Sequence, residues 1–407
     1  MTTLRQPRAL LYSIAAGIGG SGLDQVAAES LRASIDGNFL GRAIAYGGKI
    51  QNPKPSEARQ PLTSFFHNKR QSKIQNLSFS PVKLLSPLPR DYYLGAKKHA
   101  LDRAAAHQLA TGQYDLLHTW SGDALESLHV ANRLGLPSLL EIPTWHRNKG
   151  KIKKDKTWSE IQRDAAPFPR SVLNRLLVTR QQVMEEYARA TLLLVLSEKA
   201  KETFLVAGLP EEKLFLTSRG VDVERFTPAP APPEKFRAVF VGSLSRRKGV
   251  HHLLEVWRRL NLKDAELVLV GAPSKEIAPL LADAPPGVIV RGFVKDVATE
   301  LRQAAVHIFP SECEGSAKVT YEAAACGLPQ ITTRESGDVV RDGENGLLIA
   351  PNDPDALAAA IQHLHAHRDL AAHLGAAGRR RVVEHFTWDH FRLRLLRAYD
   401  MALRATT

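Results

Sequence analysis

The sequence has little cysteine and no long apolar run, and both shortages restrict what the protein can be. Only two of its 407 residues are cysteine, Cys313 and Cys326, which is too few for the disulfide framework of a small secreted scaffold. No run of about 18 consecutive apolar residues occurs, so no helix is expected to cross a membrane. These shortages favour the reducing cytoplasm, and attachment to the cytoplasmic face of the membrane stays open.

The N-terminus resembles a secretion signal only superficially. Arg5 and Arg8 precede the apolar stretch 9–18, as the basic residues of a signal peptide would. Glycines interrupt that stretch, and an amphipathic pattern follows at once. We therefore expect a first buried strand, a tight loop and a helix.

The length suits two domains of roughly 200 residues each better than one core. A stiff proline-rich run at 227–233 fits neither a helix nor a central strand, which places a domain border there. Apolar segments that alternate with helical patterns indicate parallel sheets covered on both faces. The predicted class is α/β, with two doubly wound domains facing a cleft. Strands are predicted at 9–15, 43–45, 115–118, 138–142, 192–196, 238–241, 266–270, 288–290, 306–309 and 330–332.

Positive charge gathers in the first half of the chain. Residues 1–229 hold 32 Lys and Arg against 21 Asp and Glu, whereas residues 230–407 hold 23 against 21. Most of the excess lies in two stretches, 49–103 and 147–180. This distribution predicts that the first half meets something anionic.

A glycine-rich loop follows the first predicted strand. Gly17, Gly19 and Gly22 have the spacing of the dinucleotide fingerprint Gly-x-Gly-x-x-Gly. That fingerprint also needs an acidic residue at the end of the second strand, and the segment 43–48 has none. A nicotinamide or flavin site is therefore disfavoured, and we expect either a loop that lets a substrate approach the backbone or a plain tight turn.

Two segments of the second half carry charged groups at predicted strand ends. Arg246, Arg247 and Lys248 open a helix, where cations, amides and the helix dipole favour a phosphate or diphosphate, although a solvated helix start is the plain alternative. Glu314 lies in the loop after another strand, and Glu322 follows on the next helix. Two carboxylates at this separation could accept hydrogen bonds from hydroxyls at the two ends of a sugar nucleotide.

The chain resembles the retaining family 4 glycosyltransferases of GT-B fold, whose Glu-x7-Glu motif is matched by Glu314 and Glu322. Order and spacing of further segments agree over most of residues 190–390, whereas the resemblance over 1–190 is thin. The supporting segments are Arg219-Gly-Val-Asp222, Val241-Gly242, Lys248-Gly249, Leu269-Val-Gly271, Arg291-Gly-Phe293, Phe309-Pro-Ser311, Cys326-Gly-Leu-Pro329, Asp342-Gly-Glu-Asn-Gly346 and Pro354-Asp-Ala-Leu357.

The resemblance implies two Rossmann-like domains that bind different substrates. Residues 1–229 would bind the acceptor and residues 230–387 the nucleoside diphosphate sugar. Residues 388–407 would form a helix that crosses back to the first domain. The implied reaction moves a sugar from the donor to an acceptor hydroxyl, with a glycan or a lipid-linked molecule as the acceptor.

The resemblance also assigns roles to single residues. Lys248, with Arg247, would bind the diphosphate; Glu314 would bind the transferred sugar and Glu322 the ribose. His146 would lie near the sugar, although a packed histidine is nearly as good an interpretation. The remaining donor contacts are expected at Gly19, Gly20, Gly242, Gly292, Phe293, Gly315, Ser316, Ala317 and Lys318.

The chain departs from the family pattern at three places. Ser243-Leu244 stands where many members have Arg-Leu, so Arg246 or Arg247 would have to supply the guanidinium. Ser316-Ala317 and Lys318 replace the usual aromatic residue and glycine, which leaves the identity of the donor sugar open. Arg219 replaces a common asparagine.

No metal or cofactor is predicted. His363 and His367 share a helical face, but no Asp or Glu accompanies them at the spacing of metal ligands. Asp353 precedes a predicted helix, where aspartate is a common cap. Two other functions stay open: a sugar-nucleotide epimerase, and a binding protein for nucleic acid or an anionic membrane. Nucleic acid is not expected, because the aromatics do not interleave as in an RNA-binding sheet.

Overall fold

The computed structural model describes residues 7–15, 23–45, 74–76, 85, 87–146 and 176–405. The chain divides into two compact units. The first comprises Met1–Val195, Thr203–Thr217 and Arg392–Thr407, and the second comprises Leu196–Glu202 and Ser218–Phe391. Within the described part of the chain, no helix is long and apolar enough to span a bilayer.

The first unit contains a seven-stranded sheet in the order β3-β2-β1-β4-β5-β6-β7. Every neighbouring pair is parallel. The central strands are continuous runs of buried residues, as expected for strands covered on both faces. The strands are β1 (Leu10–Ile14), β2 (Leu40–Ala45), β3 (Ile74–Asn76), β4 (Leu116–Trp120), β5 (Ser138–Glu141), β6 (Leu192–Val195) and β7 (Leu214–Leu216).

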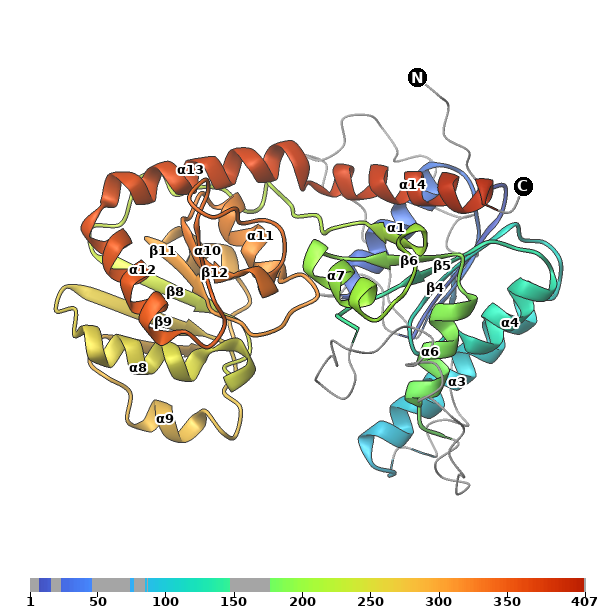
Figure 1. Ribbon diagram of the computed structural model, residues 1–407, viewed down its shortest axis with the longest axis horizontal. Helices are drawn as coiled ribbons and strands as arrows, with labels where there is room; N and C mark the ends of the chain where they lie inside the picture. Colours follow the sequence, from blue (N-terminus) through green and yellow to red (C-terminus); the bar gives the residue numbers. More distant parts are fainter. Residues whose placement is uncertain are drawn as a thin grey trace. The chain divides into compact units, whose positions relative to one another are not determined.

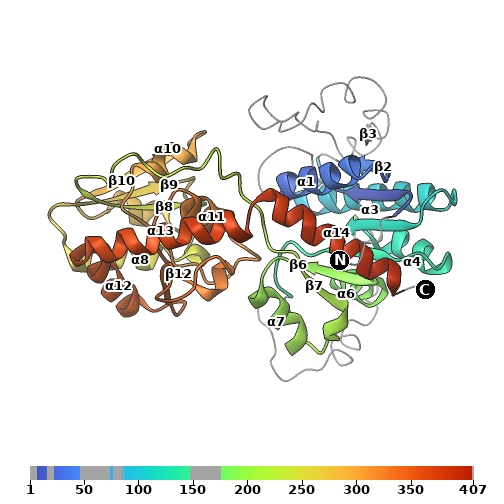
Figure 2. The same cartoon turned by 90° about the horizontal axis from the view of Figure 1, so that it is seen from above.

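The C-terminal helix α14 (Trp388–Arg404) packs in the first unit from Arg392 onward. The Tyr399 hydroxyl and the Nδ1 of buried His118 on β4 are 2.8 Å apart. Arg392 pairs with Glu29 on α1 (Leu23–Asp36), and α14 runs alongside α1 in both views (Figures 1 and 2). The other helices of this unit include α3 (Arg90–Leu109), α4 (Leu125–Arg133) and α6 (Arg180–Arg189); α7 (Glu198–Val206) begins in the second unit and ends in the first.

The second unit contains a six-stranded parallel sheet in the order β10-β9-β8-β11-β12-β13. This is the doubly wound order of dinucleotide-binding domains, in which the direction of winding reverses between the first and fourth strands. The strands are β8 (Phe236–Val241), β9 (Ala265–Val270), β10 (Val288–Gly292), β11 (Val306–Phe309), β12 (Gln330–Thr333) and β13 (Leu347–Ile349).

Helices cover both faces of the second sheet. In Figure 1, α8 lies below the strands and α13 above them. Helix α8 packs against α12, and α11 packs against α13. One apolar core continues through the unit and includes the fully buried Phe240 and Phe309. The helices are α8 (Val250–Leu260), α9 (Ala278–Ala282), α10 (Val297–Arg302), α11 (Lys318–Ala325), α12 (Pro354–Ala366) and α13 (Arg368–His385).

The division between the units differs from the border expected at residue 229. Val221 and Phe226 belong to the core of the second unit, and the Val221 amide donates to the Phe386 carbonyl at 2.9 Å. The proline-rich run also lies against this unit, because Arg368 donates to the Pro233 carbonyl at 3.1 Å. The proline-rich run therefore belongs to the second unit and is not the border between the units.

The predicted class, α/β with two doubly wound domains, is confirmed. Sequence patterns located each end of the predicted strands to within three residues, and the range 306–309 coincides with β11. They missed β3, β7 and β13, which have only three residues each. Such short edge strands form because a neighbour offers hydrogen bonds, and their own pattern is too brief to show.

Candidate functional site

The predicted donor residues gather at the carboxyl edge of the second sheet, where β8 and β11 lie side by side. The chain leaves β8 at Gly242 and enters a short 3-10 helix, Arg246–Lys248, before α8 begins. It leaves β11 at Phe309 and loops into α11. Doubly wound sheets bind ligands at this reversal of strand order.

Gly249 allows these two connections to approach each other. Its φ of 72° lies in the left-handed region, which favours glycine. A Cβ added there would lie 2.3 Å from the Pro310 carbonyl oxygen, so a larger residue would push the two loops apart. The close approach places Lys248 beside the loop that carries Glu314.

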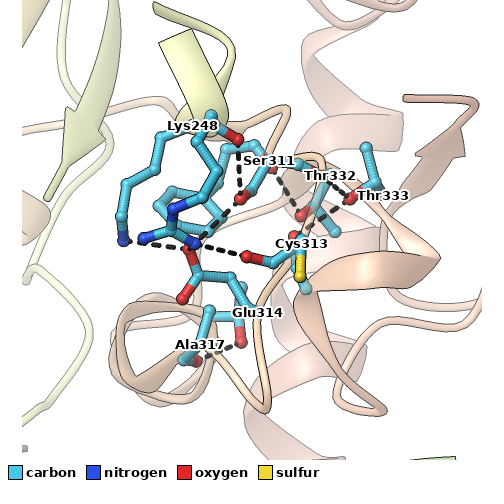
Figure 3. Close-up of polar contacts among 11 residues, drawn as sticks. Lys248, Ser311, Cys313, Glu314, Ala317, Thr332 and Thr333 are labelled. Carbon is cyan, nitrogen blue, oxygen red and sulfur yellow. Dashed lines mark hydrogen bonds and ion pairs between the residues drawn. The ribbon is translucent and has the colours of Figure 1, made fainter. Parts of the chain in front are cut away.

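Glu314 is the centre of the contacts that result (Figure 3). Its Oε1 lies 2.8 Å from Arg247 Nη1 and 3.2 Å from Lys248 Nζ, and it accepts a hydrogen bond from Ser311 Oγ at 3.2 Å. The Glu314 side chain is 16% exposed, so the carboxylate is reachable from solvent. The site thus combines one accessible carboxylate with two cations.

Arg247 contacts the Glu314 loop with both its side chain and its backbone. Its guanidinium donates to the Cys313 carbonyl as well as to Glu314. Its own carbonyl accepts from the Glu312 amide at 2.9 Å. Of the two arginines considered, Arg247 is thus the one that contacts Glu314, and 46% of its side chain remains exposed for further hydrogen bonds. Its replacement of the missing guanidinium stays a prediction.

Lys248 is held more tightly than Arg247. Its side chain is 15% exposed, and its Nζ lies 4.8 Å from the centre of the Phe309 ring, within range of a cation–π interaction. A Cβ added at Gly242 would lie 3.4 Å from Nζ, so the ammonium group sits over the end of β8. Its position is fixed before any ligand contributes.

The segment from Gly315 to Lys318 forms the start of α11. The Glu314 amide donates to the Glu335 carbonyl at 3.0 Å, and the Ala317 amide to the Ser336 carbonyl at 2.8 Å. Ser316 Oγ and the Tyr321 hydroxyl are 2.8 Å apart. The first amides of a helix have no partner within it, and they attract an anion.

Glu322 is buried one turn farther along α11, with 4% exposure. Its Oε1 lies 2.8 Å from Lys318 Nζ. Burial raises the pKa of Glu322, while Lys318, followed by Arg225 and Arg219, lowers it. Lys318 and Arg219, two of the departures from the family pattern, therefore both act electrostatically on this carboxylate.

Gly292 is the last residue of the outer strand β10, and Phe293 follows it. Gly292 has a φ of 67° with open space around its Cα, and its carbonyl accepts from the Gly271 amide at 2.8 Å. Phe293 is 82% exposed. An exposed backbone turn beside a free ring suits the predicted contact to a base, which stays a prediction.

Three predicted residues lie elsewhere. Gly19 and Gly20 fall outside the described residues. His146 belongs to the first unit, where it is 2% exposed and its ring contacts Tyr187 and Phe204. Burial, followed by the Arg180 charge, lowers the pKa of His146 to about 4. These contacts match the packed alternative, and a role near the sugar stays a prediction.

Two further residues contact this loop, and sequence patterns assigned neither of them a role. Ser311 Oγ binds Glu314, and Ser197 Oγ donates to the Gly315 carbonyl at 2.7 Å. Ser311 was part of a family segment without an assigned role. Ser197 showed only the pattern of a serine before a helix, which indicates a cap and says nothing of Gly315.

The residues weighed as metal ligands have other structural roles. Asp353 caps α12 by accepting from the Ala356 amide at 2.8 Å. The His367 Nδ1 lies 2.9 Å from the His363 carbonyl oxygen. Across the described residues, no three His, Cys, Asp or Glu side chains are grouped to hold a metal ion.

Sequence comparison relates this half of the chain to known transferases. Residues 235–367 match the family described as Glycosyl transferases group 1. The alpha-maltose-1-phosphate synthase of Mycolicibacterium smegmatis is 33% identical over 224 residues, which cover 47% of this chain and 58% of the synthase. The chain thus spans just over half the length of this curated relative.

Structural comparison extends the likeness to both units. Sucrose-phosphate synthase from Thermosynechococcus elongatus superposes with a TM-score of 0.68 at 22% identity, covering 98% of this chain and 100% of that one. HepE of Anabaena in complex with UDP-glucose gives 0.63 at 17% identity, covering 95% and 98%. The match to glycosyl transferases group 1 over residues 235–367 thus lies within a chain that has the GT-B fold of two Rossmann-like domains.

Proposed function

We propose that the protein is a retaining glycosyltransferase that moves a sugar from a nucleoside diphosphate sugar to an acceptor hydroxyl. The observation that carries the proposal is the Glu314 carboxylate, 2.8 Å from Arg247 and 3.2 Å from Lys248 at the switch point of the second sheet. The relatives named above, a glycosyltransferase family and two sugar-phosphate synthases, support sugar transfer, and HepE is a neighbour that binds UDP-glucose.

Arg247 and Lys248 would stabilise the departing diphosphate. A guanidinium has five donors and an ammonium three, so both cations can bind phosphate oxygens while still contacting Glu314. Charge develops on the diphosphate as the bond to the sugar breaks, and preorganised cations act on that charge most strongly. These groups occupy the role that a divalent ion has in metal-dependent transferases, so no metal is required.

Retention requires the new bond to form on the face from which the diphosphate leaves. The bond between the anomeric carbon and the diphosphate oxygen breaks, and the acceptor oxygen binds the same carbon. The acceptor's proton passes to the departing diphosphate oxygen, so charge and atoms balance without a separate base. Glu314 would hold the sugar and Glu322 the ribose, and this positioning would provide much of the rate.

The epimerase alternative gains no support from the relatives named above. An epimerase would consume the donor without an acceptor, whereas a transferase needs both. Formation of a disaccharide or glycoconjugate in place of an epimeric sugar nucleotide would therefore decide between them.

The acceptor is proposed to be an anionic glycan or a lipid-linked molecule at the cytoplasmic face of the membrane, as in cell-envelope glycan synthesis. The excess of basic residues in 49–103 and 147–180 supports this proposal, and most of both stretches lies outside the described residues. Two of the proteins named above carry a phosphorylated sugar in their names.

A thermal-shift screen of nucleoside diphosphate sugars tests the donor. A ligand at 100 times its dissociation constant should stabilise the protein by about 2.7 kcal/mol, and one base and sugar should stand out. The protein should then transfer that sugar in excess EDTA. Loss of activity on chelation, restored by magnesium or manganese, would contradict the metal-independent mechanism.

Sedimentation with liposomes tests the acceptor surface. Binding to anionic liposomes should be strong at low salt and should fall as salt rises, because each basic residue contributes about 1 kcal/mol within a Debye length. Changing Lys151, Lys153, Lys154 and Lys156 to Glu should weaken this binding without changing donor affinity. Equal binding of variant and parent would favour a soluble acceptor.

A further inference from the structure

We propose that Ser197 is a positioning residue of the donor site, because its hydroxyl fixes the peptide that joins Gly315 to Ser316. The proposal rests on the proposed function, since it concerns a loop assigned to the donor's diphosphate. Ser197 stands 118 residues away from Gly315 in the sequence, and both belong to the second unit.

The hydroxyl of Ser197 both donates and accepts a hydrogen bond within the protein. Ser197 is completely buried, and its Oγ donates to the Gly315 carbonyl at 2.7 Å. The same Oγ accepts from the Ala200 amide at 3.1 Å, which makes Ser197 a cap of α7. A serine hydroxyl has one proton to donate, so this proton is assigned to Gly315.

Anchoring that carbonyl also orients the next amide. A trans peptide is planar, and its carbonyl and N–H point in opposite directions. The described residues contain no cis peptide. With the Gly315 carbonyl held toward Ser197, the Ser316 N–H must point the opposite way within the same peptide plane, away from Ser197.

The Glu314 and Ala317 amides already donate within the protein, which leaves the Gly315 and Ser316 amides between them for a ligand. Glu314 and Ala317 donate to the carbonyls of Glu335 and Ser336. Among the described residues, the Ser316 amide has no hydrogen-bond acceptor. It therefore suits a phosphate oxygen just before the start of α11, two residues beyond the Glu314 that Lys248 contacts, and Ser197 sets its direction.

The segment that carries Ser197 contacts other parts of the second unit through several polar side chains. The Glu198 amide donates to both Asp338 carboxylate oxygens, at 2.9 and 3.1 Å. Arg334 pairs with Glu202, and Lys199 Nζ lies 3.8 Å from Glu335 Oε1. The segment 196–202 is thus a rigid support from which one hydroxyl reaches the loop.

Amide hydrogen exchange on the protein without ligand tests the positioning directly. Ser197→Ala should increase exchange within the peptide 312–318 about 3- to 10-fold, the effect of one buried hydrogen bond. Ser197→Gly, which keeps most of the helix-cap stability, should do the same. Ser197→Thr retains the hydroxyl and should restore protection. The control is Thr217→Val, which removes a buried hydroxyl bonded to the Val195 carbonyl at 3.2 Å in the first unit.

Kinetics then test the consequence for the donor. Ser197→Ala should lower kcat/KM about tenfold, mainly through kcat, because a misdirected amide stabilises the departing diphosphate less well. Ser197→Thr should recover most of the loss, and Thr217→Val should match the parent.

The two levels of proposal fail in different ways. Unchanged exchange at 312–318 in both Ser197→Ala and Ser197→Gly would overturn the role of Ser197, whatever the donor. An equal effect of Thr217→Val would assign the change to general destabilisation and would also overturn it. If exchange responds but the parent binds no nucleoside diphosphate sugar, the proposed function is wrong.

Discussion

Lys318 and Glu322 form an ion pair on α11, with Nζ 2.8 Å from Oε1. Burial raises the pKa of the Glu322 carboxyl, and the contact with Lys318 opposes that rise. It also occupies one carboxylate oxygen, so the second is the one left for the ribose hydroxyls. In the proposed function Lys318 would act on the donor through Glu322, and we expect its effect to depend on pH.

Lys318→Met should raise the pKa of Glu322, because burial is then opposed only by the more weakly acting Arg225 and Arg219. A protonated carboxyl is a poorer acceptor for hydroxyls, so donor affinity should fall as the solution is acidified. In the variant this loss should begin at a higher pH than in the parent. Dissociation constants measured between pH 5 and pH 8 by calorimetry would show the shift. Lys263→Met removes an exposed lysine and should leave the profile unchanged.

Glu322→Ala should weaken donor binding, and Glu322→Gln should recover part of it. An amide oxygen still accepts a hydrogen bond from ribose, whereas a methyl group does not. Fluorescence or calorimetric titration with the donor found in the thermal-shift screen would measure both. If both variants bind as the parent does, Glu322 does not hold the ribose.

Glu314→Ala should lower turnover more than donor affinity. The bond from Glu314 to the sugar is expected to strengthen as charge develops at the anomeric carbon, and an interaction made mainly in the transition state affects kcat. Initial-rate kinetics beside equilibrium donor binding separate the two quantities. A loss confined to affinity would assign Glu314 to ground-state binding alone.

Lys248→Ala should raise the activation barrier by about 2 to 4 kcal/mol, the range for removing one preorganised stabiliser of developing charge. The ammonium lies in a fixed place over Gly242 and the Phe309 ring, so a neighbouring side chain cannot replace it without movement. Rates at saturating donor, with and without EDTA, give the magnitude. Lys275→Ala, on the loop after β9, is a control that should retain the parent rate.

Protein stability should fall as pH rises from about 6.5 to 8.5. Burial raises the pKa of Glu186 to about 8 and that of Asp123 to about 7, both in the first unit. The folded state therefore binds more protons than the unfolded state in this range, and the free energy of unfolding decreases as those protons leave. Denaturant titrations at several pH values should show the slope, and Glu186→Gln should make it shallower.

Buried histidines act in a lower range and in the opposite direction. Burial lowers the pKa of His146 and His307 to about 4. The unfolded state, in which histidine has a pKa near 6.5, therefore binds more protons than the folded state below that pH. The free energy of unfolding should decrease as pH falls from about 6.5 toward 4. A free energy of unfolding that rises between pH 6.5 and pH 8.5 would contradict the assignment of Glu186 and Asp123.

Much of the fold could be read from the sequence because its causes are local. Val306–Phe309 is a continuous buried run, and α8 presents an apolar stripe at helical spacing, so residue pattern alone located both. The reversal of winding also follows from local rules, since parallel strands joined by right-handed crossovers allow few orders. The placement of Glu314 in a loop and of Glu322 on the helix that follows could be predicted from their spacing alone.

Only the tertiary structure decided which distant groups meet. Arg247 and Glu314 are 67 residues apart, and Ser197 and Gly315 are 118 apart, so no spacing rule connects either pair. The identity of residue 146 as histidine did not reveal that aromatic rings surround it. Periodicity records which face of an element is buried, and the contacts between elements depend on how whole sheets and loops pack. For that reason the sequence determined the fold class and the charged residues of the site, while packing determined how those residues are held.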